Sequence, residues 1–401
     1  MVETQILHVS DTHLGYRQYR SDVRRSDFRD NFRKAIERAI DEDVDAVVHT
    51  GDLFHDSNPS IGDLDDCGEL FARLGDAEIT TYGIVGNHER KRDTGLLDLV
   101  GRMGDVEHLG REPKLVGDVA LYGIDAVPSR SWDTTPLELA EPPAEANVTI
   151  LCLHQSFTPP LESGDHHDLS EVLDSVGIEL DGVALGHIHK PASAEVDGTE
   201  VWYAGSTART QKSQNSPRTV QLVETCDGHI ERTQIGLDTR QFESITVEFG
   251  SDDGIGHLRS RLRQQSLDDA VVALKLTGER GAMTANEADT AAREAGAAVV
   301  SVDDKRGRVD LDTGDIDVQD VEDHGAVVTD QIEDEEFGPV VERVDDRIRT
   351  DGSVPTGTTG AAEELRPDLE VAMEAAFDES DGATEDDGAT GDDEATTEVD
   401  E

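Results

Sequence analysis

Seven side chains of the types that bind metal ions stand in five short clusters along the first half of the 401-residue chain. Carboxylate, amide and imidazole groups supply the donors, and no thiolate is among them. Such ligands suit a hard or borderline divalent ion, for example Mn²⁺, Mg²⁺, Fe²⁺ or Zn²⁺. Because seven donors exceed what one tetrahedral site uses, the pattern predicts two ions. In chain order the candidate ligands are Asp11 and His13, Asp52, Asn87, His154, and His187 and His189.

Each cluster closes a short apolar run that is typical of a buried β-strand. The runs cover residues 6–9, 46–48, 82–85, 148–153 and 183–185. We therefore expect the ligands to gather at one face formed by strand ends. After the first run, apolar residues at helical spacing predict a helix that Asp27 caps and that ends at the acidic turn 41–43. The alternation predicts an α/β fold, a β-sandwich of mixed sheets flanked by helices.

The strings around the candidate ligands resemble those of the calcineurin-like metallophosphoesterases. Five strings in this order are far more specific than any one of them alone. Within that superfamily the chain resembles the archaeal DNA double-strand-break-repair nucleases, which are related to bacterial SbcD and to the eukaryotic meiotic-recombination nuclease. Glu89 is a departure, since these nucleases usually have Asp there. The strings are DTHLG at 11–15, GDLFH at 51–55, GNHE at 86–89, the lone His154, and GHIH at 186–189.

The resemblance implies a role for each of these side chains. His88 would give the leaving oxygen a proton or stabilise the phosphate, and His55 would orient the substrate or His88. A carboxylate shared by both ions would hold them about 3.5 to 4 Å apart. The implied ligands are Asp11, His13 and His189 for one ion and Asn87, His154 and His187 for the other, with Asp52 bridging both.

The resemblance also implies an activity and partners. We expect a Mn²⁺-dependent 3′ to 5′ exonuclease and endonuclease with two ions per chain, acting on DNA ends. The family further implies a homodimer that works with a coiled-coil ABC-type ATPase.

The chain divides by composition into four parts. Residues 1–240 form the predicted nuclease domain, and residues 241–306 form a small α/β unit that resembles the capping domain of the family. Residues 307–377 are acidic, with two apolar helical segments as candidates for ATPase binding. Residues 378–401 lack aromatic side chains and are predicted to be a disordered acidic tail.

The net charge of −54 is extreme, and only 7 of the 35 basic residues are lysine. This composition resembles that of haloarchaeal proteins, which work in molar salt. Such salt shortens the Debye length to about 3 Å and screens self-repulsion. Salt adaptation explains the charge without excluding nucleic acid as a partner.

Basic residues that gather near the ligand strings are therefore informative. Residues 16–38 carry eight bases against four acids, and residues 206–223 carry no acid. A DNA backbone running past the metal site would need such groups. The alternative is that these arginines pair with acids on helix faces. The candidate DNA contacts are Arg17, Arg20, Arg90, Arg209 and Lys212.

Two other functions remain open. The chain could be another metallophosphoesterase, acting on phosphoproteins or nucleotides, although it has GDLFHDSN where phosphoprotein phosphatases have GDxVDRG. It could also be mainly a DNA end-binding and tethering subunit. No apolar run is long enough to span a membrane, and the chain opens directly into a strand without a signal peptide, so we expect a cytoplasmic, nucleoid-associated protein.

Overall fold

The computed structural model describes residues 2–89, 97, 100–101, 106–132, 134–162, 166–212, 214, 216–281 and 283–307. All of them belong to the first of two compact units, Met1–Val309. The segments predicted to bind the ATPase and to form the acidic tail lie outside the described residues. Among the described residues, no helix is both long and apolar enough to cross a membrane.

The first of two six-stranded sheets has the strand order β14-β13-β1-β2-β3-β4. Neighbouring strands from β1 to β4 run parallel, and β13 pairs with β1 in the antiparallel direction. The carboxyl ends of β1, β2 and β3 therefore lie at the same edge. The strands are β1 (Val2–Val9), β2 (Ala46–Thr50), β3 (Thr80–Ile84), β4 (Val106–His108), β13 (Thr219–Cys226) and β14 (His229–Gly236).

The second sheet has the order β11-β12-β10-β7-β6-β5. Its central pairs are parallel, and the two edge strands β5 and β11 are antiparallel to their neighbours. Its strands are β5 (Lys114–Val116), β6 (Val119–Ile124), β7 (Val148–His154), β10 (Gly182–Gly186), β11 (Ala192–Val196) and β12 (Thr199–Tyr203).

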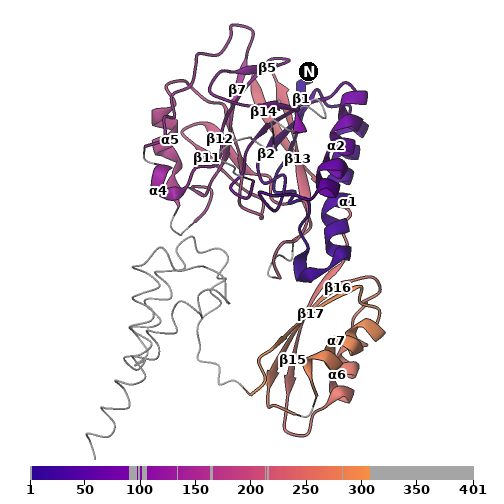
Figure 1. The fold of residues 1–401 in the computed structure, drawn as a ribbon. Helices are drawn as coiled ribbons and strands as arrows, with labels where there is room; N and C mark the ends of the chain where they lie inside the picture. Colours follow the sequence, from indigo (N-terminus) through magenta and orange to yellow (C-terminus); the bar gives the residue numbers. More distant parts are fainter. Residues whose placement is uncertain are drawn as a thin grey trace, which may run out of the picture. The chain divides into compact units, whose positions relative to one another are not determined.

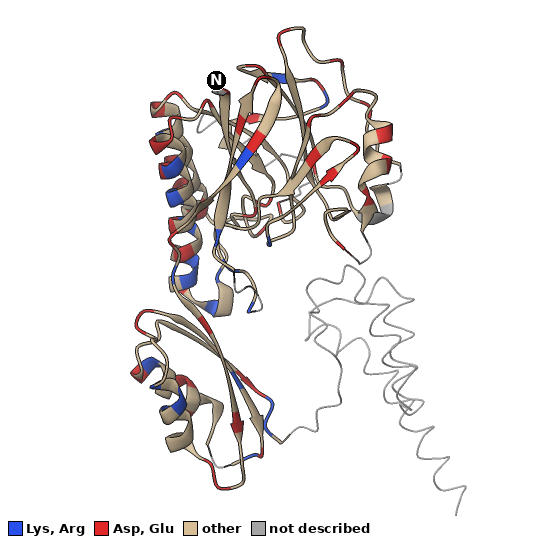
Figure 2. Cartoon of the chain, turned by 180° about the vertical axis from the view of Figure 1, so that it is seen from behind, with Lys and Arg blue, Asp and Glu red and all other residues tan. Residues whose placement is uncertain are grey.

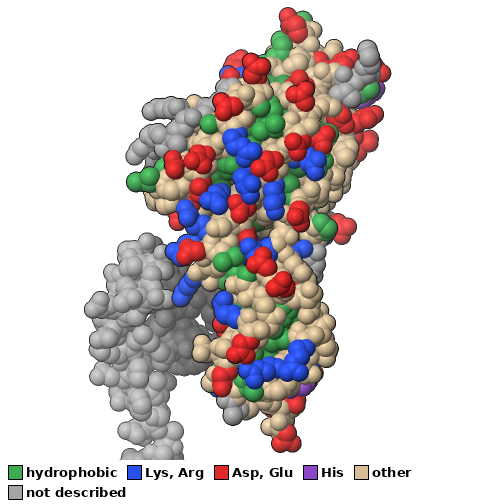
Figure 3. Space-filling view, turned by 90° about the vertical axis from the view of Figure 1, so that its right-hand side faces the viewer, with side chains coloured by type: hydrophobic (Ala, Val, Ile, Leu, Met, Phe, Trp, Pro, Cys, Tyr) green, Lys and Arg blue, Asp and Glu red, His purple; other side chains and the backbone are tan. Residues whose placement is uncertain are grey.

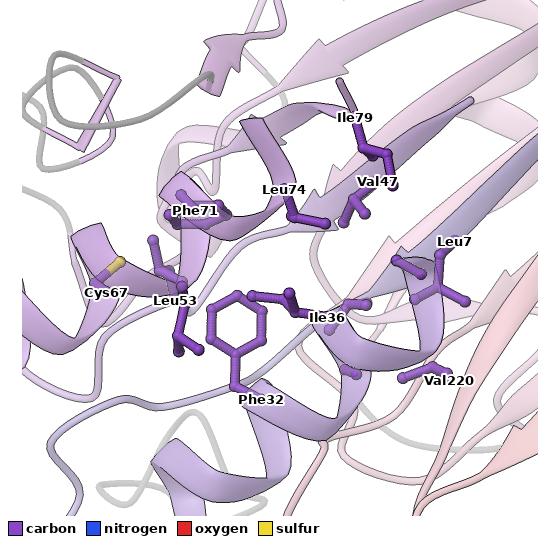
Figure 4. Close-up of a cluster of buried hydrophobic side chains, with 14 of the residues drawn as sticks. Leu7, Phe32, Ile36, Val47, Leu53, Cys67, Phe71, Leu74, Ile79 and Val220 are labelled. Carbon is purple, nitrogen blue, oxygen red and sulfur yellow. The ribbon is translucent and has the colours of Figure 1, made fainter. Parts of the chain in front are cut away.

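The two sheets pack face to face, and helices cover both outer faces (Figure 1). Apolar side chains from both sheets, such as Val48 and Ile150, form the core between them. On one side lie α1 (Asp22–Asp41) and α2 (Ile61–Asp76), and on the other α4 (Ser129–Trp132) and α5 (Leu169–Ser175). Figure 4 shows part of the core on this side, in which Phe32 of α1 and Phe71 of α2 belong to the same buried cluster as the strand residues Leu7 and Val47. This arrangement is the predicted sandwich of mixed sheets flanked by helices.

The N-terminus of α1 differs from the prediction. Ser21 caps the helix by accepting a hydrogen bond from the Arg24 backbone amide, so the helix begins well before the predicted cap Asp27. The first turn carries polar side chains, which is why apolar periodicity missed it. Asp27 is instead a buried residue within the helix. A short helix η1 (Gln18–Arg20) precedes Ser21, and a two-stranded sheet joins β8 (Phe157–Thr158) and β9 (His167–Asp168).

A separate three-stranded sheet follows the sandwich along the chain. It has the parallel order β15-β16-β17. Its own core joins the strands to two helices, for example through Leu258 and Leu274. We call these elements the three-stranded unit; a capping role for it is a proposal. They are β15 (Phe242–Phe249), α6 (Ile255–Leu262), β16 (Val271–Gly278), α7 (Ala285–Glu294) and β17 (Val299–Asp304).

Candidate metal centre

The seven candidate ligands come together where five strands of the sandwich end. In the first sheet, Asp11 and His13 follow β1, Asp52 follows β2, and Asn87 follows β3. In the second sheet, His154 is the last residue of β7, and His187 follows β10. Because these strands are parallel within each sheet, their carboxyl ends meet at one edge of the sandwich.

Asp11, His13 and His189 form the first donor set. The Nε2 atoms of His13 and His189 lie 3.1 Å apart. The Nε2 atom of His189 is also 3.6 Å from Oδ1 of Asp11. The ligand atoms of these three residues all lie within 4.8 Å of one another. One cation could therefore contact all three after small shifts.

Asn87, His154 and His187 form the second donor set. The Asn87 Oδ1 atom is 3.0 Å from Nε2 of His154 and 3.0 Å from Nδ1 of His187. An amide oxygen and two imidazole nitrogens are suitable ligands for a hard or borderline divalent ion.

Asp52 lies between the two donor sets. Its Oδ2 atom is 3.8 Å from Nε2 of His13 in the first set and 3.4 Å from Nε2 of His154 in the second. Its other oxygen, Oδ1, accepts a hydrogen bond of 3.0 Å from the backbone amide of His88. The carboxylate is thus fixed in a position from which it could contact two ions.

The backbone around these ligands is strained. Asp11, His13, Asp52 and His187 have positive φ angles of 51°, 46°, 54° and 85°. Side-chain-bearing residues rarely adopt this left-handed region, and such residues cluster at functional sites. The loops also approach very closely, because a Cβ atom at Gly86 would collide with the Asp52 carboxylate and amide. Glycine is therefore required at this position.

Hydrogen bonds at the rear nitrogen orient two of the imidazoles. His154 Nδ1 lies 2.6 Å from the carbonyl oxygen of Thr50, so it carries the proton and donates. His189 Nδ1 lies 2.6 Å from the hydroxyl of Thr210. A proton on Nδ1 leaves the lone pair on Nε2, which faces the other ligands. Such partners fix the tautomer of metal-binding histidines.

The electrostatics of the centre favour neutral imidazoles beside carboxylates. Burial lowers the pKa of His13 and of His189, and burial with repulsion from His154 lowers the pKa of His187 to about 3. Burial alone would raise the pKa of Asp52, but His154 and His13 hold it well below its usual range. Burial raises the pKa of Asp11, so a cation beside it would keep it ionised.

His154 is the only imidazole of the two donor sets whose pKa is raised, so its ring is a positive charge beside Asp52 and Asp11. Burial lowers its pKa, but the attraction of Asp52 and Asp11 outweighs burial and raises the pKa to about 9. A divalent cation would take over this role and displace the proton. Both the donor chemistry and the two converging sets therefore fit a pair of divalent ions.

His88 and His55 lie beside the centre rather than within either donor set. The Nε2 atom of His88 is 3.9 Å from Oδ2 of Asp52, and its ring remains partly exposed. The His55 ring stacks between those of Tyr16 and His88, with centroid distances of 3.7 and 5.0 Å. Burial and repulsion from His88 lower the pKa of His55 to about 4, so it is neutral.

Glu89 and Thr210 are site residues whose structural roles were not predicted from the sequence. Glu89 is buried and accepts hydrogen bonds of 3.0 Å from the backbone amides of Phe54 and Gly86, which ties the loop after β2 to the loop after β3. Burial, with repulsion from Asp52, raises the pKa of Glu89 to about 7. Its place directly after GNH is a signal for this role, whereas Thr210 carries none.

The candidate DNA contacts occupy different environments. Arg17 is exposed and pairs with Asp22 at 2.7 Å, and Arg20 is exposed as well. Arg209 is partly buried with its guanidinium 5.8 Å from the centre of the Phe242 ring, and exposed Lys212 lies 5.9 Å from the Tyr19 ring. Arg90 lies outside the described residues.

Many arginines of α1 pair with acids, as the alternative interpretation predicted. Figure 2 shows basic and acidic residues interleaved along this helix, and Figure 3 shows the same mixture of side chains on the molecular surface over α1 and α2. Arg218, which the sequence placed in a basic stretch, is fully buried and cannot reach a phosphate backbone. These pairs include Arg24–Asp27, Arg25–Asp63, Arg29–Asp66, Arg33–Glu37 and Arg38–Glu42.

Comparisons with known proteins agree with this geometry. Residues 4–191 match the family model of the calcineurin-like phosphoesterases. The chain is 40% identical to the DNA double-strand break repair protein Mre11 of Haloferax volcanii, over 82% of this chain and 70% of that protein. It is also 40% identical to Mre11 of Halobacterium salinarum, over 79% of this chain and 81% of that protein. Both relatives come from halophilic archaea, in agreement with the salt-adapted composition.

A more distant relative and a solved structure complete the comparison. Mre11 of Methanosarcina acetivorans is 37% identical over 76% of this chain, which corresponds to 51% of that longer protein. A dimetal phosphatase from Danio rerio is 14% identical, covers 59% of this chain and all of its own, and has a TM-score of 0.39. Since that score is low, the assignment depends on the sequence relatives. The chain belongs to the Mre11 family of calcineurin-like phosphoesterases.

Proposed function

We propose that this protein is a DNA double-strand-break-repair nuclease that hydrolyses phosphodiester bonds with two divalent metal ions, most suitably Mn²⁺. The observation that carries the proposal is the position of the Asp52 Oδ2 atom, within 4 Å of a nitrogen from each donor set. A carboxylate placed in this way is suited to bridge two ions. The family relatives named as DNA break-repair proteins supply the substrate class.

In the proposed mechanism the protein holds the metal ions, orients their ligands and protonates the leaving oxygen. When bound, the two metal ions would supply Lewis-acid activation of water and of the phosphate. Asp52 fixes the spacing of the two donor sets, and Thr50 and Thr210 fix the ring orientations of His154 and His189. The chain thereby provides a preorganised centre, which avoids reorganisation during the reaction.

His88 is the proposed acid for the leaving sugar oxygen. Its Nδ1–H donates to the carbonyl oxygen of His55, so its Nε2 atom remains available on the side facing Asp52. A protonated ring would give its Nε2 proton to the departing oxygen and remain as the neutral Nδ1–H tautomer. His55 then acts as a support for His88 through its carbonyl and its stacked ring.

The proposed DNA path uses basic side chains near the centre. Arg17 and Arg20 are exposed in the segment that follows His13, and Lys212 is exposed in the loop after Thr210. Arg209 and Arg90 are the other proposed contacts. Contacts of this kind would bind phosphates without reading sequence. The three-stranded unit, proposed to span residues 241–306, would cap this path beside the domain at 1–240.

The finer parts of the proposal concern activity and partners. We propose 3′ to 5′ exonuclease and endonuclease activity, a homodimer, and association with a coiled-coil ABC-type ATPase through segments of 307–377. The proposed location is the cytoplasm, in association with the nucleoid. An intact pair of donor sets argues against a role limited to tethering, since a tether does not need metal chemistry.

A substrate comparison tests the proposed function. The purified protein is incubated in molar KCl with Mn²⁺ and end-labelled duplex DNA, and in parallel with a phosphopeptide and with a cyclic nucleotide. We expect DNA cleavage that requires the metal and that exceeds turnover of the two small substrates. Phosphopeptide or nucleotide hydrolysis without DNA cleavage would show that the chain is a different phosphoesterase. Tight end binding without any cleavage would favour the tethering function.

A further inference from the structure

The proposed metal ligand His189 stands at the end of a partly buried chain of hydrogen bonds. Its Nδ1 atom is 2.6 Å from the Thr210 hydroxyl, and the same hydroxyl accepts a hydrogen bond of 3.0 Å from Gln214. The Thr210 amide in turn donates to the Gln214 side-chain oxygen at 2.9 Å. The position of the loop that carries Thr210 therefore decides where the His189 ring points.

Two residues from elsewhere in the chain hold this loop in place. The Gln18 side-chain amide of η1 donates to the carbonyl oxygen of Thr210. Arg24 of α1 donates from Nη2 to the carbonyl oxygen of Arg209 at 2.9 Å, and from Nε to the Gln18 side chain at 2.9 Å. Arg24 thus contacts the loop directly and also fixes the residue that contacts Thr210.

Arg24 is unusual because it is a buried cation. Only 3% of its surface is exposed, and its remaining nitrogen Nη1 donates to Asp27 at 2.6 Å. Burying a guanidinium is costly unless all its donors find partners. All three nitrogens do find partners, and the ring of Phe28 lies 5.1 Å from the guanidinium carbon. Such a residue is suited to define geometry rather than to meet DNA.

The outer end of the network reaches the three-stranded unit. Arg240 donates from Nε to both Asp27 oxygens, at 2.9 and 3.0 Å. Its Nη1 atom donates to the carbonyl oxygen of Asp269 at 2.8 Å. These bonds hold the Asp27 carboxylate in place, and it holds Arg24 in turn.

We infer that Arg24 is a positioning residue for the metal ligand His189, acting through Gln18 and Thr210. The inference rests on the proposed dinuclear site. It requires that the network affects the affinity for the ion held by the first donor set. The affinity for the ion held by Asn87, His154 and His187 should not depend on the network. Arg24 is accordingly a base of the segment 16–38 that orients the site and does not contact DNA.

Metal titration of the full chain tests this inference without reference to nuclease activity. Metal-free protein in molar KCl is titrated with Mn²⁺, and free Mn²⁺ is measured by electron paramagnetic resonance; Co²⁺ absorption reports the ligand geometry. Thr210→Val should weaken the binding of one of the two ions by about 10- to 100-fold. This is the range seen when the partner of a metal-binding histidine is removed. Thr210→Ser retains the hydroxyl and should bind both ions as the wild type does.

Arg24→Gln should weaken the binding of the same ion by about tenfold and change the absorption spectrum of Co²⁺ bound there. Arg306→Gln is the matched control. Arg306 is also buried, pairs with a carboxylate, donates to the Met283 carbonyl and lies 5.1 Å from a phenyl ring centre, but belongs to the three-stranded unit. It should leave both ions unchanged.

The outcomes separate the inference from the proposed function. Mn²⁺ binding that is unchanged in Thr210→Val and Arg24→Gln would overturn the inference. It would also be overturned if these two variants bound both ions equally more weakly and Arg306→Gln showed the same loss. If Arg24→Gln does not fold, Thr210→Val against Thr210→Ser decides the matter. A wild-type chain that binds one ion would contradict the dinuclear site, and the inference would then still require Thr210→Val to weaken that ion.

Discussion

The Nδ1 atom of His88 lies 2.8 Å from the backbone carbonyl oxygen of His55, to which it donates a hydrogen bond. This bond fixes the tautomer of His88 and leaves Nε2 on the side of the bridging carboxylate. Because the acceptor is a backbone atom, any residue at position 55 retains it. The His55 side chain supports His88 by stacking against its ring.

His88→Ala should retain both ions and lose activity by about 10² to 10⁴, the usual cost of removing a general acid. His55→Ala should lose less, because it retains the carbonyl that orients His88. Single-turnover cleavage rates and metal content by atomic emission measure the two effects separately. A loss of metal in His88→Ala that matches its loss of activity would make His88 a ligand instead of an acid.

Gly86→Ala should lose bound metal. The added Cβ would collide with the carboxylate and amide of Asp52, so the bridging residue would have to move. Gly110→Ala is the matched control, because a Cβ at Gly110 meets nothing within 4 Å. Mn²⁺ titration of both variants measures the difference. Equal binding in the two variants would show that the close contact of the two loops is not needed for the site.

Two buried histidines, His8 and His49, should make the protein less stable in mild acid. Burial lowers the pKa of His8 and of His49 to about 3, whereas an unfolded histidine titrates near 6.5. Between these values the unfolded chain binds protons that the folded chain does not, so the stabilisation is complete above about pH 6.5 and is lost progressively toward pH 3. At pH 5 each histidine should lower the free energy of unfolding by about 2 kcal/mol.

Urea unfolding in EDTA at pH 7.5 and pH 5.0 measures this loss without a contribution from metal release. The His8 ring accepts from Trp202 at Nδ1 and lies 2.8 Å from the Thr50 hydroxyl at Nε2, which requires the neutral form. His8→Gln keeps polar atoms there but cannot titrate, so its loss between the two pH values should be smaller by about 2 kcal/mol. An identical pH dependence in variant and wild type would refute this source of acid sensitivity.

Replacing Arg17 and Arg20 together with Ala should weaken binding to all DNA sequences alike. Each lost phosphate contact should reduce the slope of log affinity against log salt by about 0.9. Fluorescence anisotropy across a KCl series measures the slope. Arg73→Ala is the control, since Arg73 is partly exposed on α2 and pairs with Glu37. A slope that is the same in all three proteins would mean that Arg17 and Arg20 do not contact phosphates.

The sequence predicted the strand ends and the composition of the site, because ligand strings directly follow apolar runs and strand ends gather at one edge. It could not predict the contacts that orient those ligands. Thr210 lies 21 residues after His189 and belongs to no motif, so only the folded chain brings them together. Arg24 and Arg218 illustrate a different limit. A count of basic residues cannot distinguish an arginine at the surface from one that is buried with its partners.

The proposed dinuclear centre depends on Asp52, which lies between the two donor sets, and the metal stoichiometry of Asp52→Asn tests whether it bridges two ions. An amide at this position removes the charge that both ions would share. We expect the wild type to bind two Mn²⁺ per chain and Asp52→Asn to bind fewer than two, with no detectable cleavage of end-labelled DNA. Asp56→Asn, a nearby exposed change, should behave as the wild type. Two tightly bound ions and wild-type cleavage in Asp52→Asn would contradict the bridged dinuclear centre.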